Sequence, residues 1–311
     1  MTVLLTGASG FVGRAVLDAA KRRGVDVRPV FRSLTPANGH SGAVLVPGLD
    51  GEADWSQALQ GVDVVIHAAA RAHVMREEAL DPLTEYRRVN VQGTSNLARQ
   101  TAAAGVRRFV FISSIKVNGE ATSPDRPFTA DDAPAPEDAY GISKAEAETE
   151  LRRIAQETGM EVTIIRPTLV YGPGVKGNFS SLINWVHRGL LLPLGGVIHN
   201  RRSLVGLDNL VDLIWVCVEH PKAANQVFLI SDGEDISTTE LLRRIGKSLN
   251  RPARLLWVPA GLIALMASLL GKKVISKRLL GSLQVDMRKT CELLDWKPIV
   301  AVDEGLRRAV E

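Results

Sequence analysis

The chain has 311 residues, of which 45% are hydrophobic and 23% charged, the composition of a globular protein with one or two domains. Its net charge of +4 comes from 38 basic and 34 acidic residues without a long basic run, so we expect no nucleic-acid partner. Cys217 and Cys291 are too few for a disulfide framework, and no His, Cys or carboxylate cluster has metal-ligand spacing, so we expect no metal. The N-terminus lacks a signal-peptide pattern, so we expect a cytoplasmic protein.

Short apolar runs alternate with helical patterns through the first half of the chain. The runs are VLLT (3–6), VRPVF (27–31), AVLV (43–46), VDVVIHA (62–68), RFVFIS (108–113) and VTIIRP (162–167). Between them, helical patterns cover residues 11–23, about 83–104 and about 138–158. This alternation predicts the α/β class, with a parallel sheet covered by helices on both faces.

The pattern changes after residue 167, where glycine and proline interrupt the chain and the tail becomes helical. A strand-like run at 225–230 returns to the sheet. The chain is therefore predicted to form two domains, the larger from 1–168 with 204–232 and the smaller from 169–203 with 233–311.

The apolar stretch 255–271 is shorter than the roughly 20 residues that span a bilayer, and Pro259 and Gly261 interrupt it. We expect a buried helix after Pro259, or a dimer contact, and no firm membrane association. Peripheral attachment, helped by Lys272 and Lys273, is the alternative.

A glycine-rich turn joins the first strand to the first helix, with Gly7, Gly10 and Gly13 in the segment TGASGFVG. Glycines in this context allow a tight turn and a close approach of phosphates to the helix N-terminus, which Phe11 and Val12 open. The turn predicts a dinucleotide-binding site.

The second strand ends in VRPVFRS, with no Asp or Glu between Val27 and Leu34 to hold the 2′-hydroxyl of NAD. Arg32 lies where a 2′-phosphate would be bound. NADP(H) is therefore the preferred cofactor and NAD(H) a possible one, while a solvated arginine is the alternative interpretation of Arg32.

Tyr140 and Lys144 are four residues apart near the start of a helix, so both project from one face. A phenol needs its pKa lowered by about three to exchange protons near neutrality, and a nearby ammonium can supply that energy. Ser113 and Ser114 end the run 108–113, where adjacent side chains point in opposite directions. Only one of these hydroxyls is expected to face a ligand.

The segments TGASGFVG, VDVVIHAAA, VNVQGTSNL, FISS, YGISK and IIRPTLVYGPG, in this order, resemble the extended short-chain dehydrogenase/reductase family, in its nucleotide-sugar epimerase, dehydratase and ketoreductase branch. The resemblance implies a Rossmann sheet of about seven parallel strands with a small C-terminal substrate domain. It implies that Tyr140 donates or accepts the proton, that Lys144 lowers its pKa and binds the nicotinamide ribose, and that Ser114 bonds the reacting sugar oxygen.

The same resemblance implies that Asn90 and the segment His67, Ala68, Ala69 line the cofactor. It also implies a homodimer formed through the helices at 83–104 and 138–158. These assignments depend on the family likeness alone.

Dehydratases of this branch carry an Asp-Glu pair directly after the catalytic hydroxyl, whereas this chain has Ile115 and Lys116. Because isoleucine cannot move a proton, elimination of water is disfavoured. Lys116 is either a solvated loop lysine or a substrate contact.

The resemblance also assigns Asn178, Phe179 and Arg202 to the nucleoside diphosphate of a UDP-sugar substrate, and a guanidinium suits that group. Arg71 and His73 follow the fourth strand and are expected to face the ligand, without an assigned role.

Within the branch, the chain is most similar to bacterial 4-reductases that act on UDP-4-keto-6-deoxy-N-acetylglucosamine in O-antigen synthesis. The expected reaction is therefore NADPH-dependent reduction of the C4 ketone of a UDP-linked deoxy sugar. The alternatives are an NAD-dependent 4-epimerase of a UDP-hexose or UDP-N-acetylhexosamine, against which Arg32 counts, and a non-catalytic redox-sensing module. The sequence leaves the sugar and the stereochemistry at C4 open.

Overall fold

A seven-stranded parallel sheet forms the larger part of this computed structural model, which describes residues 1–33, 42–72, 81–123, 126–271 and 273–311. The strand order is β3-β2-β1-β4-β5-β6-β9. The strands are β1 (Thr2–Thr6), β2 (Asp26–Phe31), β3 (Val44–Leu45), β4 (Val64–His67), β5 (Arg108–Ile112), β6 (Glu161–Pro167) and β9 (Val227–Ile230). The predicted α/β class and strand number are confirmed.

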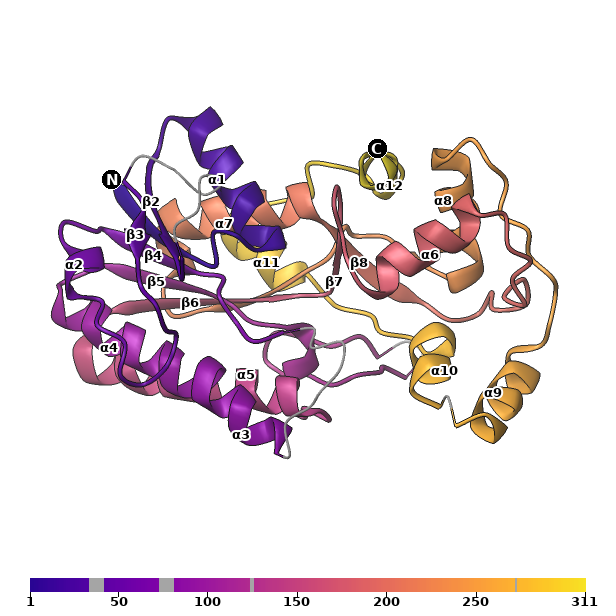
Figure 1. Cartoon of the computed structure of the whole chain (residues 1–311), viewed down its shortest axis with the longest axis horizontal. Helices are drawn as coiled ribbons and strands as arrows, with labels where there is room; N and C mark the ends of the chain where they lie inside the picture. Colours follow the sequence, from indigo (N-terminus) through magenta and orange to yellow (C-terminus); the bar gives the residue numbers. More distant parts are fainter. Residues whose placement is uncertain (34–41, 73–80, 124–125, 272) are drawn as a thin grey trace.

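Helices cover both faces of this sheet (Figure 1). One face carries α1 (Phe11–Arg23), α7 (Leu207–Glu219) and α11 (Arg288–Leu294), and the other α2 (Ser56–Leu59), α4 (Thr94–Ala103) and α5 (Ala139–Thr158). In β1, Val3 and Leu5 belong to the first core and Leu4 to the second, because successive side chains point to opposite faces. Burial on both sides explains why the strands are continuously apolar.

The three predicted helices lie within two residues of their expected bounds, and α5 shows how local caps set such limits. The carboxylate of Asp138 accepts a hydrogen bond from the Gly141 N–H at 2.7 Å at the start of α5. Gly159 ends α5 with φ 77°, a left-handed conformation that costs glycine little. Helix α5 lies beside α4, and a homodimer through these helices stays a prediction.

The predicted helix at 83–104 is confirmed in its extent, but its interior contains a π-helical segment that was not predicted. The segment is divided into α3 (Pro82–Tyr86), the π-helix η2 (Arg87–Gly93) and α4. At Gly93 a Cβ would lie 2.8 Å from the Leu49 carbonyl, so the π-helical turn is pressed against that loop. Local periodicity reveals neither this contact nor the π-helical form, which is rare in proteins.

A second, three-stranded sheet has the order β10-β8-β7, from Asp235–Ile236, Arg202–Gly206 and Leu169–Tyr171. Its core includes residues of α6 (Asn178–His187), α8 (Thr238–Ser248) and α12 (Val302–Val310). Between its visits to this sheet the chain returns to the large sheet as β9, as expected for the run at 225–230. The division into two domains at the predicted boundaries stays a prediction. Two short 3-10 turns, η3 (Ile115–Val117) and η4 (Pro221–Ala223), follow β5 and α7.

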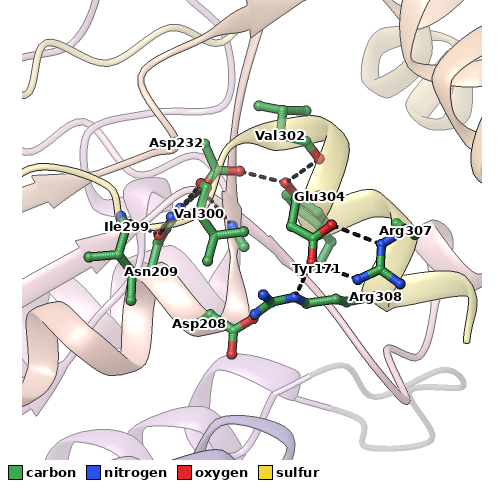
Figure 2. A network of polar contacts seen from close by, with 11 residues as sticks. Tyr171, Asp208, Asn209, Asp232, Ile299, Val300, Val302, Glu304, Arg307 and Arg308 are labelled. Carbon is green, nitrogen blue, oxygen red and sulfur yellow. Dashed lines mark hydrogen bonds and ion pairs between the residues drawn. The ribbon is translucent and has the colours of Figure 1, made fainter.

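Asp232, just past β9, joins the two sheets through buried hydrogen bonds (Figure 2). Its carboxylate accepts from the Tyr171 hydroxyl at 2.7 Å, the Gly206 N–H at 2.8 Å and the Asn209 amide at 2.7 Å. Burial raises the pKa of Asp232, and these donors oppose that shift. The network holds β7, β8 and α7 in one arrangement, which fixes the small sheet beside the carboxyl edge of the large one.

The apolar stretch 255–271 contains α9 (Ala260–Leu269), which begins after Pro259 as predicted. The helix is not buried within the chain, so that prediction was wrong, whereas a dimer contact stays a prediction. None of its ten residues is buried. A short helix, α10 (Lys273–Leu280), follows, and Lys272 lies outside the described residues. Among the helices of the described residues, none has the length and apolar content needed to cross a membrane.

Candidate functional site

The candidate site lies where the strand order reverses, at the carboxyl ends of β1, β4 and β5. In open parallel sheets this edge is where ligands bind, because the loops leaving neighbouring strands diverge there. Three segments meet at this edge: the turn after Thr6, the loop after His67, and the loop after Ile112 against which α5 packs.

The glycine turn is held by contacts that only glycine permits. Gly7 has φ +72°, and a Cβ on it would lie 2.6 Å from the Ala69 nitrogen at the end of β4. A Cβ on Gly13 would lie 2.1 Å from the Gly7 carbonyl oxygen, so helix and turn pack without space for a side chain. Ala68 and Ala69 therefore form the wall against which the turn rests.

The N-terminus of α1 is open to an anion. Gly10 provides no side-chain cap, and the first turn contains no acidic residue. The N–H groups of Phe11, Val12 and Gly13 have no acceptor one turn earlier within the helix. These groups and the helix dipole suit the diphosphate of a dinucleotide, so the residues present fit the predicted cofactor.

Arg32 directly follows β2, next to β1 in the sheet, and is exposed. This position is compatible both with binding a 2′-phosphate and with a solvated arginine. The structure therefore leaves the predicted preference for NADP(H) a prediction.

His67, predicted to line the cofactor, has its side chain turned into the core. One ring nitrogen lies 2.6 Å from the Thr6 hydroxyl and the other 3.0 Å from that of Thr94. Any contact of His67 with a cofactor would come from its backbone. Burial, with a smaller contribution from Lys144, lowers the pKa of His67 to about 3.

This buried imidazole makes the fold sensitive to acid. Because His67 binds a proton at about pH 6.5 when unfolded and only near pH 3 when folded, it should remove up to about 5 kcal/mol of stability as pH falls through that range. His67→Gln keeps polar atoms for both threonines but does not titrate. Urea unfolding should show a flatter pH dependence for the variant between pH 6.5 and 4, and equal slopes would contradict the assignment.

Asn90 is buried in η2 with its amide fully engaged. It accepts from the Arg71 N–H at 2.8 Å and donates to the Arg71 carbonyl at 3.1 Å and the Ser143 hydroxyl at 3.0 Å. Asn90 thus fastens the loop after β4 to α5, which positions the candidate cofactor site. Arg71 itself lies over the ring of Tyr86 at 5.4 Å, and His73 lies outside the described residues.

The two serines at the end of β5 face opposite ways. Ser113 is buried and donates to Glu148 at 2.6 Å, whereas Ser114 is only half-buried and accepts from the Lys116 N–H at 3.3 Å as η3 begins. Ser113 therefore braces the core. Ser114 is the hydroxyl that remains available at the sheet edge.

Lys144 lies in the core-facing side of α5, one turn after Tyr140. Its Nζ donates to the Ile112 carbonyl at 2.8 Å and lies 4.2 Å from the centre of the Phe111 ring. Burial lowers the pKa of Lys144 to about 7, and the nearby Glu148 opposes this shift. The ammonium is thus fixed at the end of β5 and titrates near neutrality.

Tyr140 departs from the expectation that Lys144 lowers its pKa. Burial raises the pKa of Tyr140, and the negative charge of Asp138 and the neighbouring Tyr86 add to the increase. The rings of Tyr86 and Tyr140 meet edge to face at 6.1 Å. Without a further positive charge, burial therefore favours the protonated form of the Tyr140 phenol.

A buried ionic network behind this site was not predicted. Arg166 donates to both carboxylate oxygens of Glu148, at 2.9 and 2.5 Å, and to the Asn118 side chain at 2.9 Å. Sequence signals were present: Glu148 continues the spacing of Tyr140 and Lys144, and Arg166 interrupts the apolar strand β6. The network holds Ser113 and the face of α5 that carries Lys144.

Lys116 is not the solvated loop lysine of the first interpretation, because its ammonium group is paired with two carboxylates. Its Nζ is bonded to Asp138, the cap of α5, and lies 3.1 Å from Glu120. Ile115 is buried in η3, and its side chain has no proton to donate to a substrate. The pair at 115–116 therefore supports the start of α5, and with it Tyr140.

The predicted substrate residues lie at the other side of the site, on the small sheet. Asn178 is exposed as the first residue of α6. Phe179 is buried and stacks on Tyr171 with ring centres 5.1 Å apart. Its side chain therefore belongs to the hydrophobic core of the small sheet.

Arg202 begins β8 and donates to the carbonyls of Arg278 at 2.8 Å and Gly281 at 3.1 Å. Burial lowers the pKa of Arg202, and the positive charge of Arg278 adds to the decrease. Arg278 also lies close enough to Asp138 to lower the pKa of that carboxyl. Two neighbouring guanidinium groups near the start of α5 are suited to an anion, and Arg278 was missed from sequence.

Comparison with known proteins places these features in one family. The profile of the NAD dependent epimerase/dehydratase family matches residues 3–231. The chain is 48% identical over its whole length to a UDP-glucose 4-epimerase of Vibrio cholerae, covering 94% of that protein. It is 29% identical to the N-acetyl-alpha-D-glucosaminyl-diphospho-ditrans,octacis-undecaprenol 4-epimerase of Escherichia coli O157:H7, over 87% of this chain and 81% of the relative.

A solved structure shares the fold over the full chain. The UDP-glucose 4-epimerase of Thermotoga maritima, crystallised with UDP-glucose, superimposes with a TM-score of 0.79 at 24% identity, covering 100% of this chain and 97% of the other. The family profile spans the glycine turn, the three strand ends and α5, which are the elements that form the candidate site. The chain belongs to the NAD dependent epimerase/dehydratase family.

Proposed function

We propose that this chain is an NAD-dependent 4-epimerase of a UDP-hexose or UDP-N-acetylhexosamine. The observation that carries the proposal is its 48% identity, end to end, to the Vibrio cholerae UDP-glucose 4-epimerase. This replaces the 4-ketoreductase as the leading hypothesis, which depended on the resemblance to bacterial 4-reductases and on Arg32. The half-buried Ser114 beside a helix that carries Tyr140 and Lys144 is consistent with either reaction.

The cofactor would be held by the glycine turn, the first N–H groups of α1 and Lys144. When bound, it supplies a hydride acceptor and donor and, in its oxidised form, a positive charge. NAD is the better-supported form because the family profile is NAD dependent. An epimerase returns each hydride it removes, so it needs no exchange of cofactor between turnovers.

Tyr140 would exchange the proton of the sugar 4-hydroxyl as C4 is oxidised, and would return it when C4 is reduced on the other face. Ser114 would orient that oxygen by a hydrogen bond. Lys144, charged at or below about pH 7, would stabilise the phenolate while bonded to the Ile112 carbonyl. Ile115, buried and without a proton to give, leaves no acid for elimination of water.

Arg202 and Arg278 would bind the diphosphate that carries the sugar, because two adjacent guanidinium groups match its charge and geometry. Named relatives act on sugars attached either to UDP or to a polyprenyl diphosphate. The diphosphate is common to both classes, so these arginines do not by themselves choose between them.

The test is interconversion of UDP-glucose with UDP-galactose, and of UDP-N-acetylglucosamine with its C4 epimer, by purified protein without added cofactor. We expect turnover of at least one pair and recovery of NAD from the denatured enzyme. Arg202→Met should raise KM for the nucleotide sugar with little change in kcat, because a guanidinium bond to diphosphate contributes equally before and during the reaction.

If neither pair is converted, and NADPH is instead oxidised in proportion to added UDP-4-keto-6-deoxy-N-acetylglucosamine, the chain is a 4-ketoreductase and Arg32 recognises the 2′-phosphate.

A further inference from the structure

Helix α9 lies on the side of the molecule away from the large sheet (Figure 1). It carries several exposed apolar residues. On α9, Leu262, Leu265, Met266 and Leu269 are spaced as one stripe and are 48%, 58%, 54% and 79% exposed. The other side of α9 includes Ile263, which packs on the hydrophobic core of the small sheet. The helix is therefore anchored on one side and presents leucine and methionine to the outside on the other.

Two further segments with exposed apolar residues lie beside each other, and one of them leads directly into α9. The Leu192 N–H bonds to the Arg254 carbonyl at 2.9 Å and the Leu256 N–H to the Leu192 carbonyl at 2.8 Å, so the segments around 191 and 256 lie side by side. Leu191, Leu256 and Trp257 are each more than half exposed. We call these three residues and the α9 stripe the apolar face. Large contiguous apolar surfaces are uncommon on monomeric proteins and mark interaction sites.

The charge around this face has one sign. The segments 162–207 and 241–285, which contain the whole apolar face, include 14 Lys and Arg residues and no Asp or Glu. The remainder of the chain has 24 basic and 34 acidic residues. The two segments that contain the apolar face are thus basic, although the net charge of the chain is only +4.

Several of these basic residues are not neutralised by acids from other segments. Arg244 and Lys277 do pair with Glu234 and Glu137. By contrast, the ion pairs recorded for the described part of the chain include none with the exposed Arg188, Arg251 or Arg254.

These arginines lie next to the apolar face. Arg254 is in the segment that bonds to Leu192, and the Arg251 guanidinium would lie 3.0 Å from a Cβ on Gly189, next to Leu190 and Leu191. Positive charge therefore borders the exposed leucines.

We propose that the apolar face docks peripherally on a membrane surface that carries anionic lipid headgroups. An exposed apolar stripe bordered by arginine, with a tryptophan at its edge, has the chemistry of an interfacial helix. A second copy of the chain is a poorer occupant, because joining two such faces would bring their positive charges together. This binding goes beyond the proposed catalytic function and does not depend on it.

The test is flotation of the purified full chain with vesicles of phosphatidylcholine alone or of three parts phosphatidylcholine to one part phosphatidylglycerol. We expect binding to the anionic vesicles and its loss with added salt, because surface attraction is screened. Leu265→Glu with Leu269→Glu should abolish binding. Arg188→Gln with Arg254→Gln should weaken it about 25-fold, at about fivefold for each basic residue removed.

Matched controls lie outside the face. Ile299→Glu changes an apolar residue that is 62% exposed, and Arg22→Gln an exposed arginine of α1; both should leave flotation unchanged. Circular dichroism melting checks that every variant folds. No flotation of the unmodified chain would overturn the proposal. So would a smaller sedimentation mass for the α9 variant without vesicles, which would identify the face as a contact between copies.

Discussion

Replacing Tyr140 with phenylalanine is expected to lower kcat by about 10²- to 10⁴-fold, the usual contribution of a positioned acid or base. The variant keeps the ring that meets Tyr86 and removes only the hydroxyl that would exchange a proton with the sugar. Because the pKa of Tyr140 is raised by burial, the hydroxyl is neutral in the free protein, and folding should not depend on its charge. The measurement is kcat for epimerisation beside a thermal melt.

Tyr86→Phe is the local control, since it removes a hydroxyl from the neighbouring ring. It should change kcat far less than the Tyr140 variant does. A Tyr140→Phe enzyme with full activity would exclude Tyr140 as the proton carrier. An unmodified chain without activity on any of the tested sugars would instead favour the non-catalytic interpretation.

Lys144→Met is expected to abolish turnover while making the fold more stable at neutral pH. The pKa of Lys144 falls from 10.5 to about 7 on folding, chiefly through burial, so the unfolded chain binds more protons between these values. The penalty for burying the amine is therefore largest below pH 7 and disappears above pH 10.5. It corresponds to about 5 kcal/mol, of which losing the bond to the Ile112 carbonyl would return about 1 to 3 kcal/mol.

The difference in stability between the Lys144→Met variant and the unmodified protein should change sign with pH. Urea unfolding should find the methionine variant more stable than the unmodified protein at pH 7. It should be less stable above pH 10.5, where only the lost hydrogen bond counts. Lys21→Met, at an exposed position of α1, serves as the control and should show no such reversal. A variant that is less stable at both pH values would mean that Lys144 stays charged within the fold through stronger compensation by Glu148.

Tyr140→Phe tests the contribution of the site to catalysis, and Lys144→Met also tests its effect on the free energy of unfolding. Lys144 is a buried amine whose hydrogen bond and neighbouring Phe111 ring fix it at the sheet edge, against the preference of a charge for water. A buried amine that is expected to destabilise the fold, and is nevertheless held in place by a hydrogen bond and a ring, is typical of a functional site.

Local patterns in the sequence were sufficient for the sheet and for two of the main helices. Continuous apolar runs predicted the strands because both faces of a parallel sheet are buried. Asp138 and Gly159 bound α5 correctly, since caps act through bonds to neighbouring residues. The glycine turn was equally local, because a left-handed Gly7 and a close Gly13 leave a signature in consecutive residues.

Errors arose where a distant segment decides the outcome. The helix expected at 83–104 contains an unpredicted π-helical segment, η2, in which Asn90 and Gly93 contact loops from elsewhere in the chain. His67 and Phe179, assigned to ligands by their place in motifs, turn into the core. No spacing rule shows which of two partners, a ligand or the interior, a side chain will meet.

The sequence by itself therefore determined the α/β class, the dinucleotide turn and the presence of Ser114, Tyr140 and Lys144 along one chain. Only the tertiary structure decided that Ser113 braces Glu148 while Ser114 stays at the edge, that Arg278 joins Arg202, and that α9 is exposed. The reason is physical: caps, turns and strand patterns are set by bonds between near neighbours, whereas burial and the pKa of a side chain depend on whatever the fold places against it.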